Sequence, residues 1–493
     1  MLRTGQDYLA SLRDGRRIYI GGELITDVTT HPAFRRAART VAGLFDLAFD
    51  PATRDTIVVT EGNETYRAYL LKARSREDLE RRLNAHRLIS QKTHGLFGRS
   101  PDHVASFVTG MAMNPEAFKT GDKPYDRHLL DYYARLKRDD LYVCYAIIPP
   151  QGARTSGPSQ VASNNLTVTA ETHAGVILNG VKMLATGAVF ANEVWVGNIF
   201  PLKPDQAKAS ITCTVPINAP GLSLWSRTSY ERDAKSEFDS PLAYRFDETD
   251  SLVIFEDVFV PWENVFTYND IERSRAIYHE TPAHTYGNHQ SNVRFWSRLQ
   301  LILGIASKIA KANAAHDNPV VRAILGDLAA HEAALSGIIY GQIQNREILA
   351  DGYVCFNRRH MYAALDFCTR NYWDISNTVR ELLGGGMFQM PADSSVMDDP
   401  ALAGLFERYL QTSQQDAVSR MKLFKLAWDL LGTEFASRHF QYEKFYAGAP
   451  FVIKGHNDRE CPWHDFEAIV DGILDSYPNP AGVSMNPALA LAQ

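Results

Sequence analysis

The chain has 493 residues, of which 45% are hydrophobic and 22% are charged. These values are ordinary for a globular protein, and the length allows a large buried core divided into two or three subdomains. With 51 basic and 57 acidic residues, the formal net charge is −6. No basic run or tail occurs, so the composition gives no indication of a nucleic-acid partner.

The sequence also shows no signal for export or for a membrane span. Its first residues lack the apolar stretch of a signal peptide, and no run of about 18 uncharged apolar residues occurs. The cysteines are odd in number, scattered and never arranged as CxxC, which indicates free thiols in a reducing compartment and disfavours a zinc or iron–sulfur site. We therefore expect a cytoplasmic protein without a bound metal.

The segment from about residue 75 to 140 is predicted to be helical. Apolar residues recur there at helical spacing, and Ser75 followed by acidic residues is a typical N-cap. The segment 126–142 repeats the same spacing. We expect residues 1–140 to form an N-terminal helical domain.

Short β-rich runs separated by glycine, asparagine and proline extend from about residue 141 to 270. The run HAGVILNGVKM contains Asn179-Gly180, a dipeptide typical of two-residue hairpin turns, and so predicts a chain reversal at that point. We expect a central β-domain over residues 141–275, built as a barrel or a sandwich.

Long helices return from about residue 290 to 445. Four segments carry an apolar stripe at helical spacing and are joined by short linkers, which predicts an antiparallel four-helix bundle within residues 276–493. The tail after Pro462 is expected to contact a neighbouring subunit. The order of helices, β-domain and four-helix bundle is that of the acyl-CoA dehydrogenase fold, a mainly helical α+β class in which flavin lies between the β-domain and the bundle.

Five blocks of the sequence, in order along the chain, resemble one family. They are LRDGRRIYIGGELITDVTTHPAF near the start, GLFGRSPDHVASFVTGM at 95–111, GVKMLATGA at 180–188, FEDVFVPWENVF at 255–266 and EKFYAGAP at 443–450. The family is that of the 4-hydroxyphenylacetate 3-hydroxylase large component, which includes chlorophenol monooxygenases. The resemblance implies a homotetrameric oxygenase component that receives FADH2 from a separate NAD(P)H:flavin reductase. It would form a flavin C4a-hydroperoxide with O2 and hydroxylate a phenol, usually beside the existing hydroxyl.

Such an electrophile needs an electron-rich ring, ideally a phenolate, in a site that excludes water. The resemblance implies that Arg99 contacts substrate and flavin, and its forked cationic donor suits a phenolate. A surface arginine paired with Asp102 is the alternative. His289 matches the histidine that chlorophenol monooxygenases of this family place against the phenol oxygen, and a neutral imidazole suits proton acceptance there. His284 is the weaker candidate for that base.

Two residues depart from the family pattern. His103 lies four residues after Arg99, on the same helix face, where many hydroxyphenylacetate hydroxylases have tyrosine. Tyr145 stands where the family usually has histidine, and tyrosine is a poor base near neutral pH. A histidine that only packs is the alternative for His103. The exchange leaves the flavin chemistry intact but argues against 4-hydroxyphenylacetate itself as the substrate.

The remaining candidates are loop and turn residues that the resemblance or their polar groups place at the flavin or the substrate. The flavin candidates are Gln151, Arg154, Thr155, Ser156, Thr186, Gly448 and Ala449. The candidates for lining the substrate, in addition to Arg99 and His103, are Phe200 and Pro201. For each of these loop and turn residues, a plain turn or core role is the alternative.

Three other interpretations compete with this one. A 4-hydroxybutyryl-CoA dehydratase of the same fold needs three cysteines and a histidine for its iron–sulfur cluster, but the cysteine positions align with Arg99, His103 and the vicinity of Trp296. An acyl-CoA dehydrogenase proper needs a carboxylate base, and no stretch offers one. A catalytically inactive flavin-binding subunit stays open because of the departures at His103 and Tyr145. The sequence does not identify the phenol, which is either free or tethered to a carrier protein.

Overall fold

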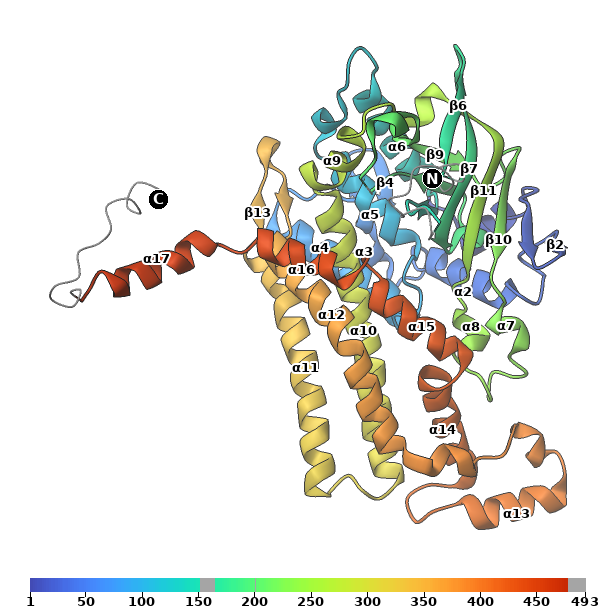
Figure 1. The fold of residues 1–493 in the computed structure, drawn as a ribbon. Helices are drawn as coiled ribbons and strands as arrows, with labels where there is room; N and C mark the ends of the chain where they lie inside the picture. Colours follow the sequence, from blue (N-terminus) through green and yellow to red (C-terminus); the bar gives the residue numbers. More distant parts are fainter. Residues whose placement is uncertain (151–164, 200, 478–493) are drawn as a thin grey trace.

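The computed structural model describes residues 1–150, 165–199 and 201–477. Figure 1 shows a part rich in helices, a β-domain and a helical bundle in chain order, so the predicted fold class is confirmed. The helices before the β-domain are α1 (Gly5–Ser11), α2 (Arg35–Asp46), α3 (Arg54–Ile57), α4 (Arg76–Lys92), α5 (Pro101–Met111) and α6 (Tyr125–Asp139). One continuous apolar core joins the three parts.

Helices α4 and α5 flank the turn that carries Arg99. α4 begins after Ser75, whose side chain accepts a hydrogen bond from the Asp78 N–H in a capping box, as the sequence predicts. α5 begins with Pro101, whose fixed φ suits the first helical position. Every residue of α5 except Phe107 is buried, so this helix belongs to the core.

Two main sheets build the β-domain. One has six strands in the order β2-β1-β10-β11-β7-β6, and the other has four in the order β12-β9-β8-β5. β1 and β2 come from the segment that the sequence predicts to be helical, and β1 pairs in parallel with β10. A separate hairpin of β3 (Val58–Glu61) and β4 (Glu64–Arg67) also lies in that segment. The strands of the main sheets are β1 (Ile18–Ile20), β2 (Glu23–Ile25), β5 (Val143–Ala146), β6 (Thr167–Glu171), β7 (Gly175–Thr186), β8 (Glu193–Val196), β9 (Thr212–Pro216), β10 (Leu222–Ser226), β11 (Asp250–Pro261) and β12 (Val265–Thr267).

The turn predicted at Asn179-Gly180 is wrong, because β7 continues through both residues. Asn179 pairs with Thr167 on β6. Its side chain donates to Oδ1 of Asp257 at 2.8 Å and accepts from the Asp257 N–H at 3.0 Å, beside a bulge in β11. At Gly180 a Cβ atom would lie 2.6 Å from the carbonyl oxygen of Asn165. Here the glycine permits a close approach of backbones, and pairing on both sides of β7 overrides the local turn preference.

The bundle in the described part of the chain consists of four long helices. They are α10 (Ala283–Ala312), α11 (Pro319–Gln344), α12 (Arg358–Leu383) and α14 (Ala417–Leu431). α10 begins earlier than predicted, so His289 lies inside the helix and not before it. The predicted fourth helix is split, because α15 (Glu434–Phe445) starts anew after Thr433, whose side chain caps it. Shorter helices accompany them: α7 (Tyr230–Asp233), α8 (Ala243–Phe246), α9 (Arg273–Glu280) and α13 (Pro400–Leu410).

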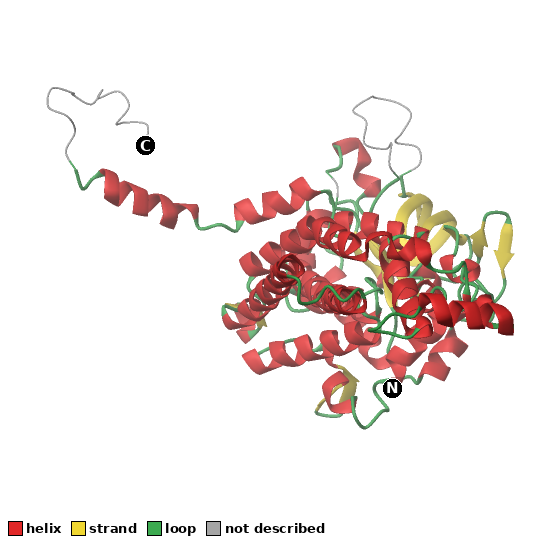
Figure 2. Cartoon of the chain, turned by 90° about the horizontal axis from the view of Figure 1, so that it is seen from below, coloured by secondary structure: helices red, strands yellow, loops and turns green. Residues whose placement is uncertain are grey.

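Two helices, α16 (Pro450–Arg459) and α17 (Trp463–Leu474), follow the bundle. α17 projects away from the body of the molecule in both views (Figures 1 and 2), and none of its residues is buried. Its exposed side chains include Phe466, Ile469 and Ile473, which recur at helical spacing and form an apolar stripe. Among the described helices, none has the length and apolar character that a membrane span requires.

Candidate active site

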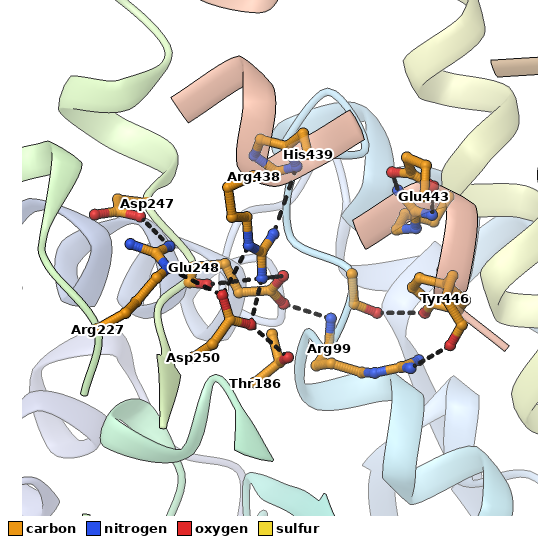
Figure 3. A network of polar contacts seen from close by, with 12 residues as sticks. Arg99, Thr186, Arg227, Asp247, Glu248, Asp250, Arg438, His439, Glu443 and Tyr446 are labelled. Atoms are coloured by element: carbon orange, nitrogen blue, oxygen red, sulfur yellow. Dashed lines mark hydrogen bonds and ion pairs between the residues drawn. The ribbon is translucent and has the colours of Figure 1, made fainter. Parts of the chain in front are cut away.

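Arg99 lies in the turn between α4 and α5 and is held through its backbone and its side chain. Its N–H donates to the carboxylate of Glu248, and its carbonyl oxygen accepts a hydrogen bond from the Tyr142 hydroxyl at 2.6 Å. The guanidinium donates to the carbonyl oxygen of Tyr446 at 2.9 Å, and its Cζ atom lies 4.0 Å from the centre of that ring. Figure 3 shows the side chain of Arg99 extended toward Tyr446. These contacts fix the position of the cation.

A network of buried charged residues contacts the backbone of Arg99 through Glu248 (Figure 3). Arg438 of α15 donates to Asp250 at 2.6 and 2.8 Å and lies 3.6 Å from Glu248. Arg227 contacts the same Asp250 at 3.0 Å. Burial alone would raise the pKa of Asp250, but Arg438 and Arg227 hold that pKa below its ordinary value. The network joins α15 to the β-domain and, through Glu248, to the backbone of Arg99.

His103 is fully buried one turn further along α5. Its Nε2 atom lies 2.6 Å from a terminal nitrogen of Arg99, and because a guanidinium only donates, Nε2 must accept. The proton of the neutral ring is then on Nδ1, which has no hydrogen-bond partner among the described residues. Burial and the charge of Arg99 hold the pKa of His103 well below its ordinary value. His103 is thus a neutral ring that orients Arg99 and presents an unpaired N–H.

Three partly exposed rings surround this pair. Tyr145 on β5 stacks on His103 with ring centres 5.4 Å apart, and its own ring centre lies 5.0 Å from the Cζ atom of Arg99. Phe107 lies 5.2 Å from His103 and 5.9 Å from Tyr145. His284 on α10 lies 6.3 Å from Phe107. We call the set of Arg99, His103, Tyr145, Phe107 and Tyr446 the Arg99 site.

His289 lies in a different buried cluster, which we call the His289 pocket. Its Nδ1 atom is 2.7 Å from Oε1 of Gln342, and its ring stacks on Phe356 with centres 3.5 Å apart. The ring of His86 is 6.1 Å away. Burial and His86 hold the pKa of His289 well below its ordinary value. No hydrogen bond joins His289 to Arg99 among the described residues, but the two regions adjoin, because Nε2 of Gln290 lies 3.3 Å from Oγ of Ser100. The expected pairing of His289 with Arg99 stays a prediction.

Asp102 is also occupied elsewhere. It forms a buried contact of 2.7 Å with His86, so the alternative of a surface ion pair between Arg99 and Asp102 is wrong. The carboxylate that holds Arg99 is that of Glu248, 149 residues away in the sequence. The sequence offers no local signal for Glu248, whereas Tyr446 lies in the recognisable block EKFYAGAP.

Of the flavin candidates in the described part of the chain, Thr186 contacts this network. Thr186 ends β7, and its hydroxyl donates to Asp250 at 2.7 Å. Gly448 has a φ of 97°, which favours glycine, and Ala449 is the N-cap of α16. Pro201 is exposed. The other sequence-predicted residues lie outside the described part: Gln151, Arg154, Thr155, Ser156 and Phe200.

A cavity of about 530 Å³ lies at a different place, beside α2 and α8. Charged side chains of both signs line it, among them Arg36, Arg39, Asp46 and Glu237. None of the sequence-predicted site residues does so. Sites for aromatic ligands are predominantly apolar with a few convergent polar groups, so we place the candidate site at Arg99 and not in this cavity.

Comparison with known proteins assigns the chain to a family. Residues 4–267 match the family described as 4-hydroxyphenylacetate 3-hydroxylase N terminal, and residues 274–475 match its C-terminal counterpart. The pyoverdin chromophore biosynthetic protein PvcC of Pseudomonas aeruginosa is 34% identical over 91% of this chain and 89% of its own length. The oxygenase component of 4-nitrophenol 2-monooxygenase from Rhodococcus sp is 32% identical over 90% of this chain and 86% of its own length.

A solved structure agrees with these sequence matches. The oxygenase component of 4-hydroxyphenylacetate 3-monooxygenase, crystallised with FAD and 4-hydroxyphenylacetate, superposes with a TM-score of 0.90 at 28% identity. The superposition covers 96% of this chain and 98% of the other. The chain described here therefore belongs to the 4-hydroxyphenylacetate 3-hydroxylase family.

Proposed function

We propose that this chain hydroxylates a phenol at the ring carbon beside the existing hydroxyl, using O2 and FADH2 from a separate NAD(P)H:flavin reductase. As a member of its family, the chain is the oxygenase component of a two-component, flavin-dependent monooxygenase for aromatic substrates, and FAD is its cofactor. In the proposed reaction, one atom of O2 enters the ring and the other leaves as water. The two electrons that this requires come from FADH2, which becomes FAD.

The observation that carries the proposal is the fixed guanidinium of Arg99 among the rings of His103, Tyr145 and Tyr446. A permanent cation in a poorly solvated site stabilises the phenolate form of a substrate, and a phenolate ring is the more electron-rich partner for attack. Because Arg99 is held before the substrate arrives, little reorganisation accompanies the reaction. The surrounding rings pack against the substrate ring and limit access of water.

The chain's residues also suit a reduced flavin beside this site. The flavin supplies the electrons and activates O2, while the protein orients the ring and excludes water. Nδ1 of His103 and the hydroxyl of Tyr442 are buried and have no hydrogen-bond partner among the described residues, which indicates polar groups in need of a ligand. We propose Thr186, Gly448 and Ala449 as flavin contacts, together with the loop candidates outside the described part of the chain.

We assign stabilisation of the phenol oxygen to Arg99 and not to His289. The Nδ1 atom of His289 is engaged by Gln342, and one ring face is covered by Phe356. Nε2 of His289 is buried and has no hydrogen-bond partner among the described residues, so the base role that the resemblance implies for His289 stays a prediction. Tyr145 and the Nδ1–H of His103 are the proposed hydrogen-bonding groups beside Arg99.

We further propose that the chain forms a homotetramer, which the exposed apolar stripe of α17 supports. For the substrate, the relatives point to two forms of phenol. The relative from Rhodococcus sp acts on 4-nitrophenol. A relative from Streptomyces globisporus, 29% identical, acts on a chlorinated hydroxyphenyl group joined to a peptidyl-carrier protein. The proposed substrate here is a single-ring phenol in one of these two forms.

The direct test supplies the full chain with O2, a flavin reductase, NAD(P)H, FAD and one phenol at a time. The proposal predicts a product heavier by one oxygen atom for at least one phenol, with less hydrogen peroxide than in the absence of the phenol. A catalytically inactive flavin-binding subunit is the alternative. It would return hydrogen peroxide alone with every free and carrier-bound phenol, and that result would contradict the proposal.

A further inference from the structure

Phe107 is the partly exposed residue of α5, whose other residues are all buried. Its ring lies 5.2 Å from His103 and 5.9 Å from Tyr145, the two proposed hydrogen-bonding residues. The ring of Phe107 is apolar, partly exposed and next to these two residues. It can therefore contact a ligand that binds at Arg99. Phe107 is therefore a wall of the Arg99 site.

Helix α10 leaves a notch for this ring at Gly287. A Cβ atom at position 287 would lie 1.9 Å from Cε2 of Phe107 and 2.1 Å from its Cδ2, which packed atoms do not tolerate. Glycine is a poor helix former, so its presence in the second turn of α10 has a packing reason. Any side chain at position 287 would displace the ring of Phe107, whose neighbours include the rings of His103 and Tyr145 in the Arg99 site.

We propose that Phe107, seated against Gly287, determines the size of the phenol that the site admits. The inference rests on the proposed function and adds a specificity-determining residue to it. With the native pair, the site takes a single ring. A small residue at position 107 opens it to a fused bicyclic phenol, and a side chain at position 287 narrows it even for a single ring.

The test compares the wild-type chain with Phe107→Ala, Gly287→Ala and the double variant. Calorimetric titration of the full chain with phenol and with 2-naphthol gives the affinities, and product mass in the reductase-coupled assay gives the hydroxylation rates. Phe107→Ala is expected to raise the preference for 2-naphthol over phenol by about tenfold or more. Gly287→Ala is expected to weaken both ligands by about tenfold. The double variant is expected to show the same preference for 2-naphthol as Phe107→Ala, because it lacks the ring that an alanine at position 287 would displace.

Val108→Ala is the matched control. Val108 is the next residue on α5 and is fully buried in the core, so this change removes apolar volume from the same helix on another face. It is expected to lower Tm and to leave the ratio of the two affinities unchanged. An equal shift of that ratio in Val108→Ala would show that any loosening of α5 broadens the site, and it would overturn the inference.

The outcomes separate this inference from the proposed function. If the wild-type chain hydroxylates phenol and Phe107→Ala keeps the wild-type preference, the inference is overturned and the proposed function stands. If the wild-type chain binds and hydroxylates no phenol, the proposed function fails and the inference fails with it. If Phe107→Ala does not fold, Gly287→Ala decides, and unchanged phenol affinity in that folded variant overturns the inference.

Discussion

His103 and His289 are both fully buried, and burial lowers the pKa of both, yet their hydrogen-bond partners differ. His103 shares a hydrogen bond with the guanidinium of Arg99 and stacks on the partly exposed ring of Tyr145. His289 is enclosed between Gln342 and Phe356. His103 shares its hydrogen bond with a cation, whereas the hydrogen-bond partner of His289 is a neutral amide, so the neighbours of a histidine, more than its pKa, indicate its role.

The largest expected effect is that of a substitution in the ion network of Arg438, Asp250 and Glu248. Arg438→Met leaves Glu248 buried without its cation and Asp250 with Arg227 alone, and is expected to destabilise the chain by about 3–5 kcal/mol. Denaturant unfolding measures this. The surface change Arg370→Met, which removes a half-exposed pair with Asp366, should cost about 1 kcal/mol or less. Equal effects of the two changes would show that the network does not support the site.

The same network has a predicted pH dependence. The pKa of Asp250 is lower in the folded chain than in the unfolded one, so its stabilising contribution is fully present above the unfolded value of about 3.9. It is lost as the pH falls through the lowered folded value. Wild-type stability should therefore drop in acid by more than that of Arg438→Met.

Substitutions of Tyr446 test whether its ring positions the guanidinium of Arg99. Tyr446→Leu removes the ring that lies 4.0 Å from Arg99 and 4.7 Å from Arg294, and should lower kcat/KM by about tenfold, or 1–2 kcal/mol. Tyr446→Phe keeps the ring and loses the hydroxyl, which donates to the carbonyl oxygen of Gly98, so it should cost about 0.5–1.5 kcal/mol of stability. Equal loss of activity in both variants would contradict a positioning role for the ring.

His103 gives a smaller effect with a distinct pH signature. Its folded pKa lies well below the unfolded value of about 6.5, so protonation favours the unfolded chain. Its contribution to stability is present above that value and is lost as the pH falls below it. His103→Gln retains an acceptor for Arg99 and should lose less stability than the wild type on acidification to pH 5. An ionisation near pH 6.5 in kcat/KM that disappears in His103→Gln would contradict a neutral His103.

The smallest expected effect on ligand binding is that of His289→Asn. The change disturbs the contact with Gln342 and is expected to cost about 1–3 kcal/mol of stability. The affinity for a phenol should change by less than about 0.5 kcal/mol, because no hydrogen bond or ring contact joins His289 to Arg99 among the described residues. A folded His289→Asn variant that binds the phenol but loses most of its hydroxylation would restore His289 as the base.

The sequence predicts the helices and turns that depend on residues close together in the chain. Helical periodicity and the cap at Ser75 predict α4, and the alternation of helices and strands predicts the order of the three parts. Pro101 marks the end of the turn that carries Arg99. The Asn179-Gly180 signal is equally local and is wrong, because pairing with β6 and β11 outweighs a two-residue preference.

The partners within the site could not be predicted in this way. Glu248 and Tyr446 reach Arg99 across 149 and 347 residues of sequence, and no periodicity or motif encodes such a contact. Gly287 could be recognised only with the ring of Phe107 in view. The resemblance and the chemistry of a neutral imidazole favour His289, but its position depends on which face of α10 it occupies, and the sequence predicts a later start for that helix.

Ionisation of bound 4-nitrophenol tests the central claim most directly, since its phenolate is visible by absorbance. If Arg99 binds the phenol oxygen, the wild-type chain binds the phenolate more tightly than the neutral phenol and so lowers the apparent pKa of the ligand. Arg99→Met should abolish that shift, and His289→Asn should keep it. A full shift in Arg99→Met, or its loss in a folded His289→Asn variant, would contradict the assignment of the phenol oxygen to Arg99.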